Sequence, residues 1–359
     1  MSAMTSVPAG PFELRRDDDR FTEGVRALER ELKRVPLETV LARANRAATR
    51  RGPTGSGAFG SMRPRPVDWY CFDAADNAVT YWYPQGLTCS SDAGAAGNVF
   101  VVSWYYRPED GERGVRLTFL NAAALRYRHV LLVEARADGD IAPIDIHAGG
   151  IAWYGDLIYV ADTTRGFRVF DLRQIFEVDG EEEGVIGRRE GVYHAFGYRY
   201  VMPQTGSWTT TARGARFSFA AVDRTASPDL LISGEYVEEP GGTGRVARWP
   251  LNSDGTLRSG ADGVAAALDA YALPGPRIQG ALSHSGTWYL SQGAGSARNG
   301  TLIVAEGPED AKDAKDAEGR VTRRPYPVGP EDLTCVRSRG QVWSVSEFAG
   351  RRVVYGVPL

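Results

Sequence analysis

Short apolar runs separated by turn-forming residues cover most of this chain. From about Asp68 onward, segments rich in Val, Ile, Tyr, Trp and Phe alternate with Gly, Asp, Asn and Pro. This spacing predicts many short strands joined by tight turns. The numerous aromatic residues within these runs also favour sheet packing over helix bundles.

A single helical region precedes the strands, between Asp19 and Arg50. Pro36 separates its two apolar stripes, and proline fits the first turn of a helix. We therefore expect one helix to end near Arg34 and another to begin near Pro36. A Gly-, Pro- and Ser-rich segment that follows predicts a linker. The expected division is a helical N-terminal extension at 1–50, a linker at 51–66 and a strand-rich domain at 67–359.

The strand pattern occurs five times, with a period of about sixty residues. Each repeat begins with an apolar strand, and a second and a third strand follow at similar places. The first strands align at Gly86, Gly150, Phe219, Gly280 and Asp332. Because an antiparallel sheet of three or four strands is a propeller blade, the sequence predicts an all-β, five-bladed β-propeller, with six blades as the alternative.

The last repeat has only three strands before Leu359, so another part of the chain must complete it. The run DWYCFD, from Asp68 to Asp73, precedes the first repeat and is the natural fourth strand. Pairing the two ends of the domain in one blade would protect the edges that an open ring exposes.

Propeller geometry predicts where ligand-binding side chains gather. The first strand of a blade begins, and the second ends, on the same face, so polar residues at these positions should converge at one mouth of the central channel. The first-strand positions hold Gln85, His147, Gln279, Glu331, Arg216 and Arg277; the second-strand ends hold Tyr105, Asp162, Glu235, Gln292 and Glu347.

His147 and Glu331 are the candidates for proton transfer in this set, because histidine titrates near neutral pH and a carboxyl can serve as an acid or a base. The binding candidates are Gln85, Asp162, Glu235, Gln279, Gln292, Glu347 and Arg277. The alternative is structural, since Asp and Glu also accept backbone donors in tight turns.

Several chemistries remain open at such a mouth. Two carboxylates from different blades could act as acid and base on a glycosidic bond, for example Glu331 with Asp162 or Glu347. Carboxylate and amide oxygens suit Ca²⁺, and His147 would add a ligand for Zn²⁺, although no spacing motif supports either metal. The chain has no Walker loop and no serine elbow, so we expect no nucleotide cofactor.

Composition restricts the partners. The formal net charge is -3, without the basic field that phosphate backbones attract, so we expect no nucleic acid. No apolar run is long enough to cross a bilayer or to form a signal-peptide core, which predicts no membrane contact and a chain that stays in the cytoplasm. Cys71, Cys89 and Cys335 are expected to be small buried side chains, with a Cys71–Cys89 bridge as the alternative for an exported protein. We expect a monomer.

The runs YWYPQG, HAGGIAWYGDLIYVADTTRGFRVFDL, GYRYVMPQ and GPEDL resemble a group of actinobacterial secreted proteins of unknown function. That resemblance implies a propeller and suggests export from the cytoplasm. More distantly, HAGGIAW and LIYVADTTRGFRVFDL look like repeats of NHL, SMP-30 lactonase and strictosidine synthase-like propellers, which usually have six blades. Neither group supplies catalytic residues for this chain.

Three functions fit these observations. The first is a hydrolase or lyase that acts on a small molecule or glycan at the mouth. The second is a non-catalytic binding protein that uses the same rim, with Trp82, Tyr83 and Trp153 stacking on the ligand. The third is a protein-interaction platform on the outer faces, which an exposed apolar patch would indicate.

Overall fold

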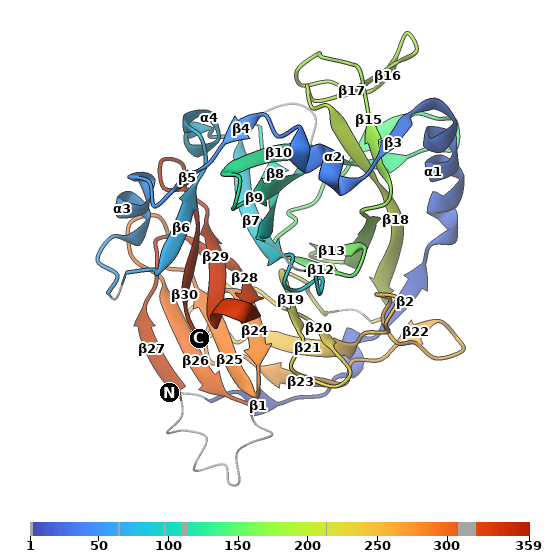
Figure 1. Ribbon diagram of the computed structural model, residues 1–359. Helices are drawn as coiled ribbons and strands as arrows, with labels where there is room; N and C mark the ends of the chain where they lie inside the picture. Colours follow the sequence, from blue (N-terminus) through green and yellow to red (C-terminus); the bar gives the residue numbers. More distant parts are fainter. Residues whose placement is uncertain (1–2, 64, 96–97, 109–113, 213, 308–320) are drawn as a thin grey trace.

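The computed structural model describes residues 3–359 except 64, 96–97, 109–113, 213 and 308–320. Five blades surround a common axis (Figure 1), so the chain is a five-bladed β-propeller and the six-bladed alternative is wrong. The innermost strands contact one another in a closed ring, from the first blade to the fifth and back. They are β7 (Trp82–Cys89), β12 (Ile151–Tyr154), β19 (Phe219–Asp223), β24 (Ile278–His284) and β28 (Pro330–Val336).

Three further strands extend each blade outward, and each pairs antiparallel with its neighbour within the blade. The first two blades contain β8 (Val99–Tyr106), β9 (Val115–Asn121) and β10 (Arg126–Ala135), then β13 (Leu157–Asp162), β14 (Gly166–Asp171) and β18 (Tyr200–Thr210). The third and fourth contain β20 (Leu230–Gly234), β21 (Arg245–Pro250) and β23 (Asp269–Ala272), then β25 (Thr287–Gln292), β26 (Thr301–Glu306) and β27 (Val321–Pro325). The fifth contains β29 (Gln341–Ser346), β30 (Val353–Pro358) and β6 (Asp68–Cys71).

The ring is closed by strands from the two ends of the domain, as predicted. Strand β6 pairs antiparallel with β30, with Tyr70 opposite Val354. Tyr70 stacks on Trp343 of β29, at a ring-centroid distance of 5.8 Å. The fifth blade therefore holds the start and the end of the ring together in one sheet, and β6 covers the edge of β30 that would otherwise be open.

The N-terminal residues wrap around the outside of the blades (Figure 1). Helices α1 (Asp19–Glu31) and α2 (Leu37–Ala42) lie on either side of Pro36, which confirms the expected break. Short strands between and beside them pair with the blades: β1 (Thr5–Ser6) with β23, β2 (Leu14–Asp17) with β18, β3 (Lys33–Val35) with β15 (Ile175–Glu177), β4 (Arg46–Ala47) with β10, and β5 (Thr49–Arg50) with β6.

Residues 51–66, expected to be a linker, include the helix α3 (Thr54–Phe59). Phe59 is buried, with its ring edge-on to Trp69 and to Tyr355 of the fifth blade. This apolar contact fixes the segment against the propeller, because a buried Phe gains about 2 to 3 kcal/mol over an exposed one. A second short helix, α4 (Ala74–Ala78), follows β6 and is capped by the Asp73 carboxylate, which accepts from the Asp76 amide at 2.9 Å.

The first two blades are joined more closely than the others. The outer strands β10 and β18 pair in parallel, with Leu131 opposite Val201, so both blades belong to one sheet. Near this junction are β11 (Ile141–Pro143) and a projecting hairpin of β16 (Ile186–Arg189) and β17 (Val192–Ala195), whereas β22 (Val264–Ala265) lies beside β2 at the other end of β18. The three cysteines are free and buried, as expected. Within the described part of the chain, no helix has the length and apolar character to span a membrane.

Candidate functional site

Three of the five innermost strands carry an irregularity at the same repeat position. The register shifts between Pro84 and Leu87 in β7, between Ile278 and Gly280 in β24, and between Pro330 and Leu333 in β28. A β-bulge of this kind changes the direction of the side chains it contains and is common beside active sites. The residues inside the three bulges include Gln85, Gln279 and Glu331, all of which the sequence places at the mouth.

Asp332 closes the propeller axis below these residues. Its side chain is fully buried and accepts hydrogen bonds from the amides of Leu87 at 3.3 Å, Ile151 at 3.0 Å and Ala220 at 3.3 Å. Each of these amides belongs to the residue that follows the aligned repeat position of its blade, which confirms the alignment of the repeats. One carboxylate thus links the innermost strands of the first, second, third and fifth blades.

Glycines at the aligned positions let the strands approach so closely. A Cβ atom on Gly86 would lie 2.8 Å from the Ile151 nitrogen, and one on Gly150 would lie 2.1 Å from the Ala220 nitrogen. A Cβ on Gly280 would lie 2.8 Å from the Asp332 Cα. No side chain larger than hydrogen fits at these points, so the axis is blocked at the level of Asp332.

Glu331 is held just above this block. Its backbone carbonyl accepts from the hydroxyls of Ser291 at 2.6 Å and Ser344 at 3.1 Å, which fixes the bulge between the two neighbouring strands. Its side chain is 1% exposed, and Gln279 Nε2 donates to Glu331 Oε1 at 3.3 Å. Burial, reinforced by the negative charges of Glu347 and Asp332, raises the pKa of Glu331 well above its usual value.

Glu347 follows β29, the second strand of the same blade, by one residue, and its charge acts on Glu331. Burial raises its pKa above the usual value, but Arg352, a hydrogen bond from Gln85 and Arg107 all act in the opposite direction. Arg352 is fully buried beneath the site and donates to the Glu347 carbonyl at 2.9 Å. The two carboxyls therefore differ in kind: Glu347 has cationic neighbours, whereas the charges that act on Glu331 are negative.

Tyrosine and histidine rings complete this side of the mouth. Tyr105 stacks on Tyr83, with ring centroids 5.3 Å apart, and lies against the ring of His147 at 4.3 Å. Burial, together with the charge of Glu347, raises the pKa of Tyr105 to about 12. Burial and the charge of Arg107 lower the pKa of His147 to about 4, so its imidazole is neutral at pH 7. We call Gln85, Tyr105, His147, Gln279, Glu331 and Glu347 the mouth cluster.

Three predicted rim residues are bound within their own blades instead. Asp162 is paired with Arg168 of β14 at 3.0 Å, and Glu235 forms a two-bonded pair with Arg245 of β21 at 2.6 and 2.8 Å. Gln292 donates to the Pro276 carbonyl at 2.8 Å. Their side chains are satisfied by adjacent strands and loops, and the backbone of Gln292 pairs with Ile278, next to Gln279 of the mouth cluster.

The two arginines of the predicted set also have local partners. Arg277 donates to the Glu238 carbonyl at 3.3 Å, and its charge acts on Tyr236 near the mouth. Arg216 is exposed, and its amide donates to the Glu235 carboxylate at 3.3 Å. Arg277 thus lies at the edge of the mouth, whereas Arg216 supports the turn around Glu235.

Of the three aromatic residues expected to stack on a ligand, only Tyr83 lies in the mouth. Trp82 is 2% exposed and packs on Phe196 and Tyr106. Trp153 is at the opposite end of its strand, where its indole donates to the Gly155 carbonyl at 2.8 Å. A strand crosses the propeller from face to face, so residues near its two ends cannot serve one mouth.

Sequence reasoning did not single out Arg107, Tyr236 and Arg352. Arg107 follows β8 by one residue and Tyr236 follows β20 by two residues, so an extended search of those loops would have found them. Arg352 precedes the third strand of the last blade and has no repeat counterpart to indicate it. In the described residues, no group of three or more His, Cys, Asp or Glu side chains is arranged to hold a metal ion.

No protein-family model matches the chain, and no curated protein matches it. Among solved structures, a GH43_1 enzyme from Xanthomonas citri complexed with xylotriose aligns over 94% of this chain and 93% of its own, with 10% sequence identity and a TM-score of 0.35. Likeness at this level does not bear on function. The topology supports a propeller, and no comparison supports a relationship to actinobacterial secreted proteins or to NHL-type propellers.

Proposed function

We propose that the mouth cluster is the active site of a hydrolase that acts on a glycan or a similar polyhydroxylated molecule. Glu331 serves as the general acid and Glu347 as the carboxylate base or nucleophile. The observation that carries this proposal is the unlike surroundings of the two carboxyls. Enzymes that cleave acetals need one protonated and one ionised carboxyl at the same pH, and they obtain them by separating the two environments.

The remaining side chains suit a polyhydroxylated ligand. Gln85 and Gln279 can each donate and accept hydrogen bonds to hydroxyl groups while also contacting the two glutamates. The stacked pair of Tyr83 and Tyr105 offers ring faces against which the apolar face of a sugar can pack. His147, neutral at pH 7, can accept or donate one hydrogen bond at the rim.

The tyrosine pair also favours a second candidate function, a binding protein without catalysis. Aromatic rings beside amides are sufficient to hold a glycan, and the acid and base would then serve only as hydrogen-bonding groups. Catalysis requires Glu331 and Glu347 to exchange protons with the ligand, whereas binding does not. The two functions therefore differ in how they respond to isosteric Glu→Gln changes.

The test is hydrolysis of a panel of aryl glycosides and short oligosaccharides by the wild-type protein, Glu331→Gln and Glu347→Gln. An acid–base role predicts loss of roughly 10²- to 10⁴-fold in kcat for each variant, with ligand affinity kept within a few-fold. Glu23→Gln, an exposed position on α1 outside the blades, is the matched control. Saturable binding by calorimetry without turnover would favour the binding protein, and neither binding nor turnover would overturn both functions.

A further inference from the structure

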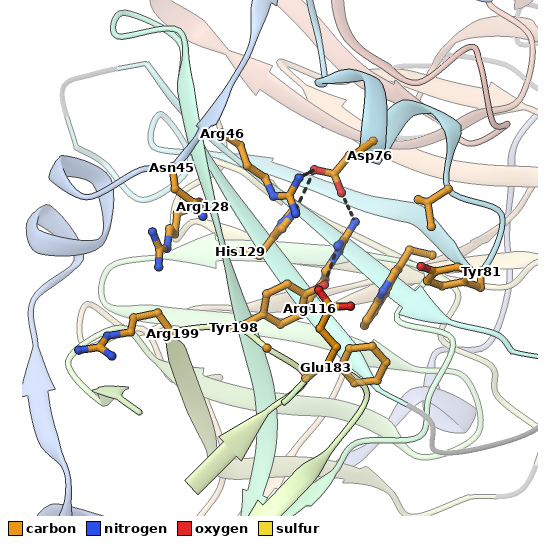
Figure 2. A pocket seen from close by; sticks show the side chains of 15 residues that line it. Asn45, Arg46, Asp76, Tyr81, Arg116, Arg128, His129, Glu183, Tyr198 and Arg199 are labelled. Carbon is orange, nitrogen blue, oxygen red and sulfur yellow. Dashed lines mark hydrogen bonds and ion pairs between the residues drawn. The ribbon is translucent and has the colours of Figure 1, made fainter. Parts of the chain in front are cut away.

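A cavity of about 240 Å³ lies outside the mouth cluster, on the first blade (Figure 2). It is bounded by β4, α4, the start of β7, strands β9 and β10, and the turn that leads from β17 to β18. A single water occupies about 30 Å³ of liquid, so this volume admits a small organic molecule. Four arginines line it, Arg46, Arg116, Arg128 and Arg199, against two carboxylates, Asp76 and Glu183.

Arg116 forms the deep wall of this arginine pocket. It is 2% exposed, pairs with Asp76 at 2.8 Å and donates to the Tyr198 hydroxyl at 2.7 Å. The guanidinium carbon lies 4.6 Å from the ring centroids of both Trp82 and Trp104. Its Nε has no partner among the described residues, so a donor at the bottom of the pocket is unused.

Asp76 is already fully engaged. Besides Arg116, it lies 3.4 Å from Arg46 and accepts from the Tyr127 hydroxyl at 2.7 Å and from His129 Nε2 at 3.0 Å. Burial and Arg116 lower the pKa of His129 to about 4, so the imidazole donates without adding a charge. One carboxylate therefore balances two arginines, and Asp73 assists only Arg46, at 3.1 Å.

The outer wall has a similar shortage of carboxylates. Glu177 is shared by Arg43 at 2.8 Å and Arg199 at 3.0 Å, with Asp179 also pairing with Arg199 at 2.9 Å. Arg128 donates to the Arg43 carbonyl, and no described carboxylate forms an ion pair with it. Burial and the charges of Arg199 and Arg46 lower the pKa of Arg128, while Tyr200 and Glu177 act in the opposite direction.

The walls of the pocket differ in chemistry. Figure 2 shows Arg46, Arg128 and Arg199 on one side and Tyr81 on the other. Tyr81 is 47% exposed, although a large aromatic side chain is usually covered, and Phe196 lies near it in the lining. The three arginines belong to different elements of the lining, and guanidinium groups form charge-assisted hydrogen bonds with anions that carry several oxygens. The aromatic side then suits an apolar or ring-shaped substituent.

We propose that the arginine pocket binds a small phosphate monoester, with the phosphoryl group among Arg46, Arg128 and Arg199 and the organic part against Tyr81 and Phe196. This site is separate from the mouth cluster and does not depend on the proposed hydrolase activity. Glu183 lies in the same lining and opposes an anion, so its charge tunes the affinity.

Calorimetric titration of the full chain with phenyl phosphate, inorganic phosphate and benzoate, at low and constant ionic strength, tests the proposal. Phenyl phosphate should bind saturably and most tightly of the three. Arg128→Gln should weaken it by roughly tenfold or more, since a charge-assisted hydrogen bond is lost. Glu183→Gln should tighten it by about two- to fivefold, because an opposing surface charge is removed.

Two controls separate this site from general surface charge and from misfolding. Arg26→Gln removes the same charge from an exposed position on α1 and should leave binding unchanged, as should Glu331→Gln at the mouth. Arg128→Lys keeps the charge and should still bind less tightly, since lysine lacks the planar fork. The proposal is overturned by absence of saturable binding, by tighter binding of benzoate, or by equal weakening in Arg26→Gln and Arg128→Gln.

Discussion

Glu331 and Glu347 differ in their neighbours more than in their chemistry. For Glu331, burial and two negative charges favour the protonated form, whereas Arg352 and Arg107 favour ionisation of Glu347. Their positions in the sequence repeats are enough to predict that both residues place a carboxyl at the same mouth. Sequence position could not assign their roles, because the contact of Arg352 with Glu347 depends on the fold of the loop between β29 and β30, and Arg107 comes from a different blade.

This difference predicts a bell-shaped pH dependence of kcat/KM for a glycan or aryl glycoside. Activity should rise as pH passes through the pKa of Glu347, which must be ionised, and fall as pH passes through the higher pKa of Glu331, which must be protonated. Both pKa values are raised, so the optimum lies above the usual carboxyl range. Glu331→Gln should remove the alkaline limb, and a profile with both limbs intact in this variant would contradict the assignment.

Asp76 offers a residue-scale prediction about stability. Asp76→Asn leaves Arg116 buried without its counter-ion, so we expect a loss of about 3 to 5 kcal/mol in the free energy of unfolding, measured with urea. Asp156→Asn, whose carboxylate is 61% exposed and 3.6 Å from Arg173, should cost no more than about 1 kcal/mol. Similar losses in the two variants would show that the buried Asp76–Arg116 pair stabilises the fold no more than an exposed ion pair does.

The same carboxylate makes stability depend on pH. His129, Arg116 and Arg46 hold the pKa of Asp76 well below its unfolded value of about 3.9. Its contribution is therefore fully present above that unfolded pKa and is lost as pH falls through the range below it. Between neutral pH and pH 3, Asp76→Asn should flatten the decline in unfolding free energy that the wild type shows.

At the scale of the element, the innermost strands depend on glycine where they meet. Gly150→Ala would place a Cβ 2.1 Å from the Ala220 nitrogen, so β12 and β19 would have to separate. We expect a loss of about 1 to 3 kcal/mol, as for other overpacked interiors, in thermal or urea unfolding. Gly10→Ala, where nothing lies within 4 Å of the added carbon, is the control and should be nearly neutral.

The elements also show what a sequence can and cannot predict. The five repeats can be recognised in the sequence because each blade needs an apolar strand at a fixed place. The closing strand β6 can be recognised because the last repeat has only three strands of its own. Bulges at Gln85, Gln279 and Glu331 leave no periodic signal, since they shift the register by a residue or two. Asp162 occupies a repeat position like that of Glu347, but its carboxylate is paired with Arg168. Strands of two to four residues around α1 and α2 are too short to show periodicity.

At the scale of the whole molecule, Asp332 connects four blades through one carboxylate. Asp332→Asn replaces one accepting oxygen with a donor that faces backbone amides, so we expect a loss of about 2 to 4 kcal/mol with a single unfolding transition. Asp223→Asn is a similarly buried control whose carboxylate, among the described residues, accepts from the amide and the hydroxyl of Thr225. If the two variants lost equal stability, the central carboxylate would have no special role in joining the blades.

The blocked axis restricts how a long ligand can be used. A polymer cannot be threaded from one face of the propeller to the other, because glycine backbones and Asp332 fill the way through. Any ligand that reaches Glu331 and Glu347 must approach from one face, and every product must leave through that same face. We therefore expect products to compete with fresh substrate for a single opening, so that added product slows the enzyme.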